Sequence, residues 1–205
     1  MERFASVGED DCALISYTSG TTADPKGIML SHKNLVTNSE QSLHMFAVEE
    51  DYRILLILPL DHSFAHTTGM YVFLASGASL ASVQLGRTPA ASLKNVFTNI
   101  REIRPDALLS VPTVAKNLKK NIENGINKKG SLTAKLFKTG LRSAYAYNGD
   151  GSDRGKGLRK IHWPLYKLVD LLVFSKIREN FGGKLKYFVG GGALLDIDLQ
   201  RFFYA

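Results

Sequence analysis

Short apolar runs alternate with segments of helical periodicity along most of the chain. The runs span residues 12–19, 54–60, 79–85, 107–111 and 185–191. Each run is almost continuously apolar, which is typical of strands covered on both faces of a sheet. Apolar residues at helical spacing fill 31–46 and 90–103, and Pro112 stands at the first turn of another helix. This alternation predicts an α/β domain with a largely parallel sheet flanked by helices.

The second half of the chain has a different pattern. Residues 131–147 and 165–181 show helical spacing, and the segment 148–160 between them is polar and glycine-rich with no apolar period. We expect 148–160 to form a flexible loop within the domain. The apolar run 168–174 is too short to span a bilayer and contains Asp170.

Composition narrows the class of protein. With 44% hydrophobic and 22% charged residues among 205, the chain is in the globular range, which argues against a disordered or integral membrane protein. The single cysteine, Cys12, excludes an internal disulfide and a metal site made of paired cysteines. The N-terminal residues do not have the pattern of a secretion signal, so we expect a cytoplasmic protein.

The net charge of +7 comes from one region of the chain. Residues 112–160 contain twelve Lys and Arg against three acidic residues, a net charge of +9, so the remainder carries −2. Such a segment suggests either peripheral attachment to an anionic membrane surface or a basic module that binds nucleic acid. Because the sequence has no RNA-binding signature and no interleaving of aromatic and basic residues, we expect no nucleic acid partner.

The segment YTSGTTADPKG at 17–27 is the most informative part of the sequence. It follows an apolar strand and precedes a helix that opens at Ser31. Its glycines and hydroxyl residues offer backbone N–H and O–H groups within one loop, and Lys26 adds a positive charge, which together suit a polyphosphate. Pro25 stands where the Walker pattern requires glycine, which argues against a P-loop GTPase or ATPase.

Three motifs in this order resemble those of the acyl-adenylate-forming (AMP-binding) superfamily. YTSGTTADPKG followed by IMLSHKNL is similar to its phosphate loop, LPLDHSF at 58–64 to its next conserved block, and YFVGGGALLD at 187–196 to a glycine-rich strand end. The stretches 108–122 and 172–195 resemble the long-chain fatty acyl-CoA synthetase branch. The resemblance implies a partial N-terminal domain of an acyl-CoA synthetase-like fold over residues 1–205.

The resemblance also implies roles for individual residues. His62 would be the catalytic residue that orients the carboxylate, Gly191, Gly192 and Ala193 would approach the adenine and acyl chain, and more weakly matched positions would line an acyl tunnel. Those tunnel positions are Phe64, His66 and Gly69. The phosphates of ATP would contact Thr18, Ser19, Gly20, Thr21, Thr22 and Lys26.

Two positions depart from the family pattern. Ala23 replaces a glycine in the phosphate loop, which would cost strain if that position has positive φ. Leu194 replaces a proline at a turn, and we expect this change to be tolerated.

The function implied is that of an ATP-dependent long-chain fatty acid:CoA ligase, an enzyme of fatty acid metabolism. Its substrates would be a fatty acid, ATP and coenzyme A, with magnesium as the metal; Thr18 is a candidate magnesium ligand, and the main ligand is expected beyond Ala205. Two alternatives stay open: an adenylating enzyme that passes the acyl group to a carrier protein, and a non-enzymatic basic binding module.

The resemblance covers only the middle of a family member. The aromatic-Gly-x-Thr-Glu block and the lysine-bearing C-terminal lid domain of that family do not occur in this sequence. We therefore expect a truncated chain that is inactive by itself. The sequence does not predict an oligomeric state.

Overall fold

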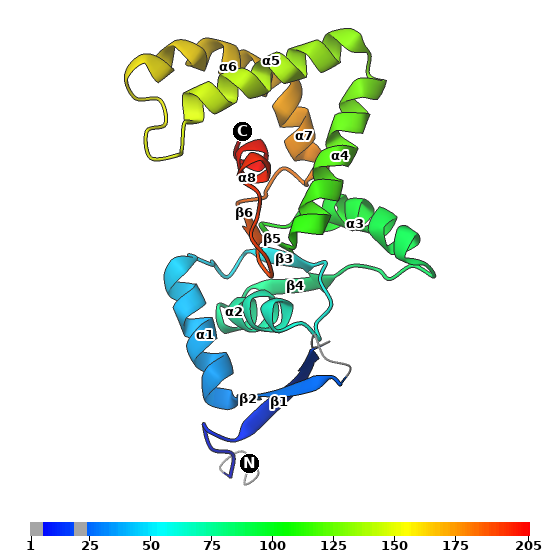
Figure 1. Ribbon diagram of the computed structural model, residues 1–205, viewed down its shortest axis with the longest axis vertical. Coiled ribbons are helices and arrows are strands. Elements are labelled where there is room, and N and C mark those ends of the chain that lie inside the picture. The colour runs from blue at the N-terminus through cyan, green and yellow to red at the C-terminus, as the bar shows by residue number, and fades with distance from the viewer. Residues whose placement is uncertain (1–5, 19–23) are drawn as a thin grey trace. The chain divides into compact units, whose positions relative to one another are not determined.

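The computed structural model describes residues 6–18 and 24–205. The chain forms two compact units, Met1–Val83 and Gln84–Ala205. Each unit contains a pair of parallel strands accompanied by helices (Figure 1). The predicted α/β class with parallel strands is confirmed.

The strands of the first unit form two separate pairs. β1 (Cys12–Thr18) and β2 (Lys26–Ser31) make an antiparallel hairpin, whereas β3 (Arg53–Leu56) and β4 (Ser79–Ser82) run parallel. Ile54 and Leu55 on β3 are fully buried, as expected of a strand covered on both faces. The parallel pair therefore contributes to the core of this unit.

The described part of the first unit also contains three helical segments. α1 (His32–Met45) begins with a capping box, in which the Asn34 N–H donates to Ser31 Oγ at 3.3 Å and the Ser31 N–H donates to Asn34 Oδ1 at 3.0 Å. η1 (Ala65–Tyr71) is a π-helix that continues into α2 (Val72–Ala75). The sequence pattern predicted α1 but neither η1 nor α2.

In the second unit, β5 (Ala107–Ser110) pairs in parallel with β6 (Tyr187–Gly190), and all four residues of β5 are buried. α3 (Pro89–Ile103) precedes β5, and α4 (Pro112–Lys128) follows it with proline in its first turn, as predicted. α8 (Ile197–Tyr204) begins after the loop that leaves β6.

The rest of the second unit is a helical hairpin. α5 (Ser131–Asn148) is followed by the 3₁₀-helix η2 (Gly157–His162), α6 (Trp163–Val169), the π-helix η3 (Asp170–Phe174) and α7 (Ser175–Asn180). α6 runs alongside α5 (Figure 1). The single helix predicted at 165–181 is thus three consecutive helical segments. The buried apolar side chains of these three segments belong to a core cluster that also includes residues of α4, α5 and α8. The cluster consists of Ile126, Phe137, Ala144, Tyr166, Val169, Val173, Phe174 and Phe202.

Two expectations change at this level. The run 12–19 was predicted as a strand buried on both faces, but β1 pairs antiparallel with β2 and exposes Ile15 and Tyr17, because a two-stranded hairpin leaves much of its surface to solvent. The segment 148–160 contains specific hydrogen bonds and an ion pair. The Gly155 N–H donates to the Tyr147 carbonyl at 2.9 Å, and Arg159 Nε pairs with Asp153 Oδ2 at 2.6 Å. Its flexibility stays a prediction.

Candidate functional site

The β1–β2 hairpin carries the glycine- and hydroxyl-rich motif at its turn. In the strand register Thr18 stands opposite Lys26, so both ends of the loop are joined at the last rung of the hairpin. Ser19, Gly20, Thr21, Thr22 and Ala23 lie outside the described residues. Lys26 is exposed at the base of this loop. The Lys26 ammonium group therefore adds a positive charge at the last rung of the hairpin.

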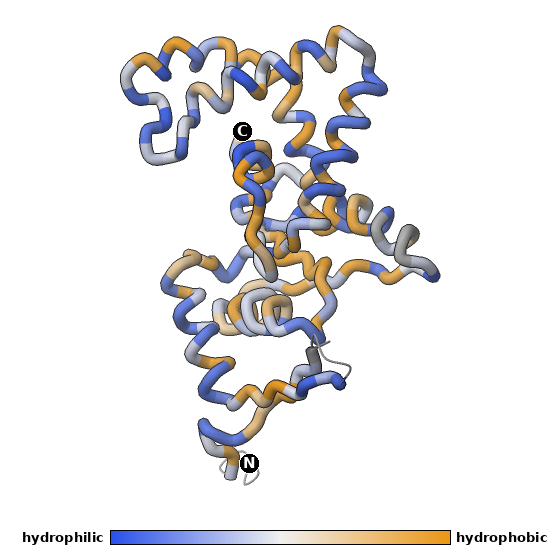
Figure 2. Tube along the Cα trace, viewed as in Figure 1, coloured by the Kyte–Doolittle hydropathy of each residue, from blue (hydrophilic) through white to orange (hydrophobic). Residues whose placement is uncertain are grey.

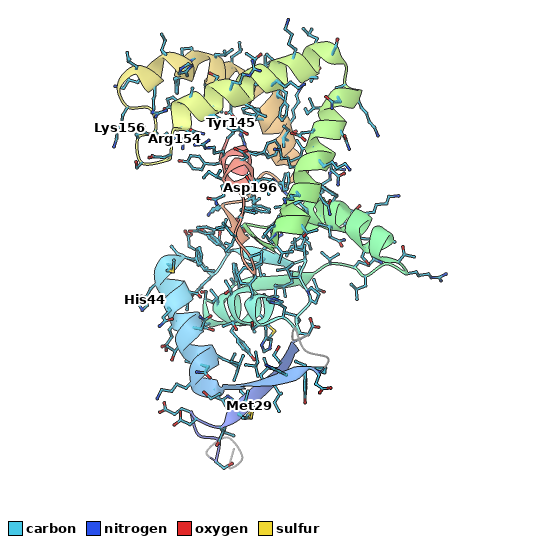
Figure 3. All side chains as sticks on the ribbon, in the orientation of Figure 1. Met29, His44, Tyr145, Arg154, Lys156 and Asp196 are labelled. Carbon is cyan, nitrogen blue, oxygen red and sulfur yellow. The ribbon has the colours of Figure 1, made fainter. Side chains whose placement is uncertain are left out.

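A strand that the sequence did not predict separates the loop from the helix. The motif was expected to lead directly into a helix at Ser31, but β2 (Lys26–Ser31) intervenes, and Ser31 is the N-cap of α1. Met29 of this strand is exposed, and it is labelled on the hairpin in Figure 3. The N-terminus of α1 therefore starts one strand length after Lys26.

His62 lies in a tight turn between β3 and η1. Its N–H donates to the Pro59 carbonyl at 3.3 Å, and its ring Nδ1 accepts from the Phe64 N–H at 3.2 Å. Because Nδ1 accepts, the neutral imidazole carries its proton on Nε2. The ring is exposed, so this Nε2–H is able to donate to a carboxylate or phosphate oxygen.

The predicted tunnel residues Phe64, His66 and Gly69 lie at or within the π-helix η1. Phe64 precedes the first turn, and Gly69 is buried inside the helix. The His66 ring packs against Tyr71 at 4.6 Å between centroids, and its Nδ1 is buried without a hydrogen-bond partner in the described structure. π-helical turns are frequent at functional sites. The tunnel role of these residues stays a prediction.

In the second unit, Gly191, Gly192 and Ala193 leave the carboxyl end of β6. Ser110 and Gly190 are register partners at the ends of β5 and β6, and the Gly191 N–H donates to the Ser110 carbonyl at 3.0 Å. Gly192 has φ of 78°, a conformation that favours glycine. Ligands of open α/β sheets bind outside the carboxyl ends of parallel strands, so the loop is placed where a ligand is expected. Leu194 is 94% exposed, and the leucine side chain meets no steric obstacle.

The structure gathers these residues in two groups. Thr18, Lys26 and His62 belong to the first unit together with the η1 residues, whereas Gly191–Ala193 belong to the second. Sequence reasoning missed three contributors: strand β2, the Phe64 amide that fixes the His62 ring, and the Ser110 carbonyl that holds Gly191. Two of these are backbone groups, which no side-chain motif reveals.

Residues 6–18 and 24–205 offer neither a metal-binding cluster nor a membrane-spanning helix. No cluster of three His, Cys, Asp or Glu side chains in these ranges is placed to bind a metal. None of the helices in this part of the chain combines the length and hydrophobicity needed to cross a membrane.

Curated relatives are similar over almost the whole chain. This chain is 32% identical over 197 residues to long-chain-fatty-acid--CoA ligase 1 of Saccharomyces cerevisiae. The aligned region covers 95% of this chain and 26% of that protein. The chain is 30% identical over 195 residues to long chain acyl-CoA synthetase 8 of Arabidopsis thaliana, covering 93% of this chain and 26% of the relative. The chain therefore spans about a quarter of the length of these relatives.

Solved structures support the fold. The adenylation domain of a carboxylate reductase from Mycobacterium chelonae matches with a TM-score of 0.62 and 21% identity, over 95% of this chain and 25% of that one. ATP-bound MatB from Rhodopseudomonas palustris matches with a TM-score of 0.54 and 23% identity, over 95% and 27% of the two chains. Finally, the family model described as AMP-binding enzyme matches residues 2–205, so the chain belongs to the AMP-binding enzyme family.

Proposed function

We propose that this chain contributes to a long-chain fatty acid:CoA ligase, which activates a fatty acid as acyl-AMP and transfers the acyl group to coenzyme A. Relatives named as long-chain acyl-CoA ligases or synthetases, at about 30% identity, support the substrate class. The observation that carries the proposal is the hairpin register, which sets Lys26 at the base of the phosphate-loop motif.

In the first half-reaction a carboxylate oxygen attacks the α-phosphorus of ATP, and the bond to the bridging oxygen of pyrophosphate breaks. The bond's electron pair leaves with pyrophosphate. Two anions must approach each other, so positioning and charge neutralisation are the main tasks of the protein. Lys26 would offset part of the charge of the departing pyrophosphate, and the N–H and hydroxyl groups of residues 18–22 would donate hydrogen bonds to it.

His62 suits the other side of this reaction. Since its Nδ1 is occupied by the Phe64 amide, the Nε2–H would donate to a carboxylate oxygen and orient the nucleophile. The role assigned is orientation and not proton abstraction, because a fatty acid is already ionised near neutral pH. His66 and Gly69 on η1 would extend this side of the site toward the acyl chain.

In the second half-reaction the sulfur of coenzyme A attacks the acyl carbonyl, and AMP leaves with the electron pair of the broken anhydride bond. Gly191, Gly192 and Ala193 would allow the nucleotide to approach the backbone closely, since two of them lack a Cβ. Magnesium would arrive with ATP and neutralise phosphate charge. Thr18 is the residue of this chain that would offer an oxygen ligand to the magnesium.

The test compares two exposed lysines of the first unit. Lys26→Ala should weaken ATP binding by about tenfold or more, since a charge-assisted hydrogen bond contributes about 1.5–3 kcal/mol. Lys33→Ala is the matched control: Lys33 pairs with Glu9 at 2.9 Å on the surface, so its removal should leave ATP affinity unchanged. Calorimetric titration with ATP measures both, and equal losses in the two variants would refute the phosphate role of Lys26.

A second assay distinguishes the acyl acceptor. A protein of the relatives' length that contains this chain is supplied with ATP, oleate and either coenzyme A or a holo carrier protein. Oleoyl-CoA should form with coenzyme A, and transfer only to the carrier would favour the alternative enzyme. The 205-residue chain alone should not release AMP, as its sequence predicts.

A further inference from the structure

The segment from η2 to η3 is apolar on two faces. One face is accounted for by the core of the second unit: Val169 is fully buried, Phe174 packs edge-on against Phe137 at 5.9 Å, and the Tyr166 ring stacks on Tyr147 at 5.4 Å. These contacts attach α6 and η3 to α5. They leave the opposite face of the same segment unexplained.

That opposite face carries a second row of large aliphatic side chains, here called the leucine stripe. Its members are Leu158, Ile161, Leu165, Leu168, Leu171 and Leu172, which are between 40% and 91% exposed. Most recur at intervals of three and four residues, as expected of one side of a helical segment. Figure 2 shows apolar residues alternating with hydrophilic ones along this segment. Single exposed leucines are common, but six in fifteen residues form a patch that calls for a partner.

Basic side chains border the leucine stripe. Lys156, Arg159, Lys160, Lys167 and Lys176 lie within residues 156–176. Figure 3 places Lys156 and the neighbouring Arg154 on the loop that joins α5 to η2. The one acidic residue in 156–176, Asp170, is buried and forms ion pairs with Arg178 at 2.6 Å and Lys167 at 3.5 Å. Arg159 pairs with Asp153 at 2.6 Å and Lys167 with Asp170, so Lys156, Lys160 and Lys176 supply the net positive charge beside the leucine stripe.

The exposed leucines and the neighbouring lysines together favour one kind of partner over others. A second copy of the chain would bring two cationic surfaces together in a symmetric contact. Nucleic acid would reward the lysines but not six exposed aliphatic side chains, because its surface charge is on the phosphates. An anionic lipid surface rewards both: headgroups attract the lysines, and the acyl boundary takes up the leucines.

We propose that the leucine stripe and its flanking lysines form a membrane-surface binding site, in which the η2–α6–η3 segment lies in the headgroup region of an anionic bilayer. The basic segment 112–160 suggested peripheral attachment from sequence; the site proposed here is residues 156–176, which overlaps that segment only at its end. The inference is independent of the ligase chemistry, because it needs neither ATP nor a fatty acid.

The first experiment measures partition of the 205-residue chain onto vesicles by flotation, using phosphatidylcholine alone or mixed with phosphatidylserine. The chain should float with the mixed vesicles. The triple variant Leu158→Ser, Leu168→Ser and Leu171→Ser should bind at least about tenfold more weakly, because each buried CH₂ contributes about 0.8 kcal/mol. Leu132→Ser, at an exposed leucine of α5 outside the stripe, is the matched control and should bind normally.

The second experiment tests the charge. Lys156→Gln with Lys160→Gln should weaken binding to the mixed vesicles by more than about tenfold, since each lysine near an anionic surface contributes about 1 kcal/mol. The control pair Lys116→Gln and Lys120→Gln removes the same charge from α4 and should have a much smaller effect. Circular dichroism of every variant verifies that the helices are intact.

Three results would overturn the proposal. Equal flotation with the two vesicle types would show that binding does not depend on anionic lipid. Equal losses in the stripe and control variants would show that binding does not depend on the leucine stripe. Absence of flotation, combined with a dimer in light scattering that the triple variant dissociates, would identify the leucine stripe as a contact between copies of the chain. A loss of ATP binding would bear only on the proposed ligase function.

Discussion

Two glycine-containing motifs carry candidate site residues, one in each unit, and they adjoin strands of opposite character. The motif at 17–27 includes the last residues of β1 and the first residues of β2, an antiparallel hairpin in which Ile15 is 49% exposed. The loop at 191–193 leaves β6, whose partner β5 is completely buried, with Leu108 at 0% exposure. The first motif therefore adjoins a strand ladder with exposed side chains, and the second loop leaves a strand pair that is part of a core.

The two regions differ in what they contribute: β5 and β6 contribute mainly to stability, and the β1–β2 hairpin contributes mainly to the proposed ligand binding. Burial of β5 stabilises the second unit and fixes the position of Ser110, whose carbonyl holds the Gly191 amide. The β1–β2 hairpin buries little, and its contribution is geometric: the register brings Thr18 and Lys26 to the same rung. Substitutions in β5 should therefore affect unfolding, whereas substitutions at the hairpin should affect the ligand.

The largest expected effect compares Leu108→Ala on β5 with Ile15→Ala on β1. Leu108→Ala should lower the free energy of unfolding by about 3 kcal/mol, because it leaves a cavity in a packed core. Ile15→Ala removes a half-exposed side chain and should cost less than about 1 kcal/mol. Urea unfolding measures both values. Similar losses in the two variants would show that the hairpin is as much a part of a core as β5.

A smaller effect concerns the contact between α5 and α6 in the second unit. A Cβ atom at Gly140 would overlap the Val169 side chain, including its Cβ, so Gly140→Ala should destabilise by about 2 kcal/mol. Gly125→Ala on α4 is the matched control: nothing lies within 4 Å of the added Cβ, so the variant should be more stable by about 0.5–1 kcal/mol. Thermal unfolding compares them, and a stabilised Gly140→Ala would contradict the close packing of the two helices.

The buried strands were the most predictable part of the fold. β4, β5 and β6 fall inside predicted apolar runs, and β3 begins one residue before its run, at the exposed Arg53. β5 is buried at every position, as expected of a strand covered on both faces, whereas β6 is only partly buried. β2 was missed because Lys26–Ser31 is short, exposed and begins inside the glycine-rich motif. η1 was missed because the sequence AHTTGMY has no amphipathic period, and its wide turns depend on neighbouring residues.

For the candidate site, the sequence predicted which residues matter but not how they are held. The His62 tautomer depends on the Phe64 amide, a backbone contact that no residue pattern encodes. The leucine stripe was equally hidden, because residues 158–174 carry apolar side chains on both sides of the helical segment. Which side of the segment is buried depends on its packing against α5, where the Val169 side chain packs against Gly140. This contact is a property of the tertiary structure and is not visible in the sequence pattern.

The smallest effect sharpens the comparison at the loop that leaves β6. Gly192 and Gly183 have φ of 78° and 72°, so alanine at either position should cost about 1 kcal/mol of stability through the same backbone strain. Only Gly192 adjoins the ends of β5 and β6, where the nucleotide is proposed to bind. Gly192→Ala should therefore also weaken binding of a non-hydrolysable acyl-AMP analogue, whereas Gly183→Ala should not. If both variants lost stability but neither lost affinity, the loop would be a structural turn, and the buried strand pair would have no part in holding the ligand.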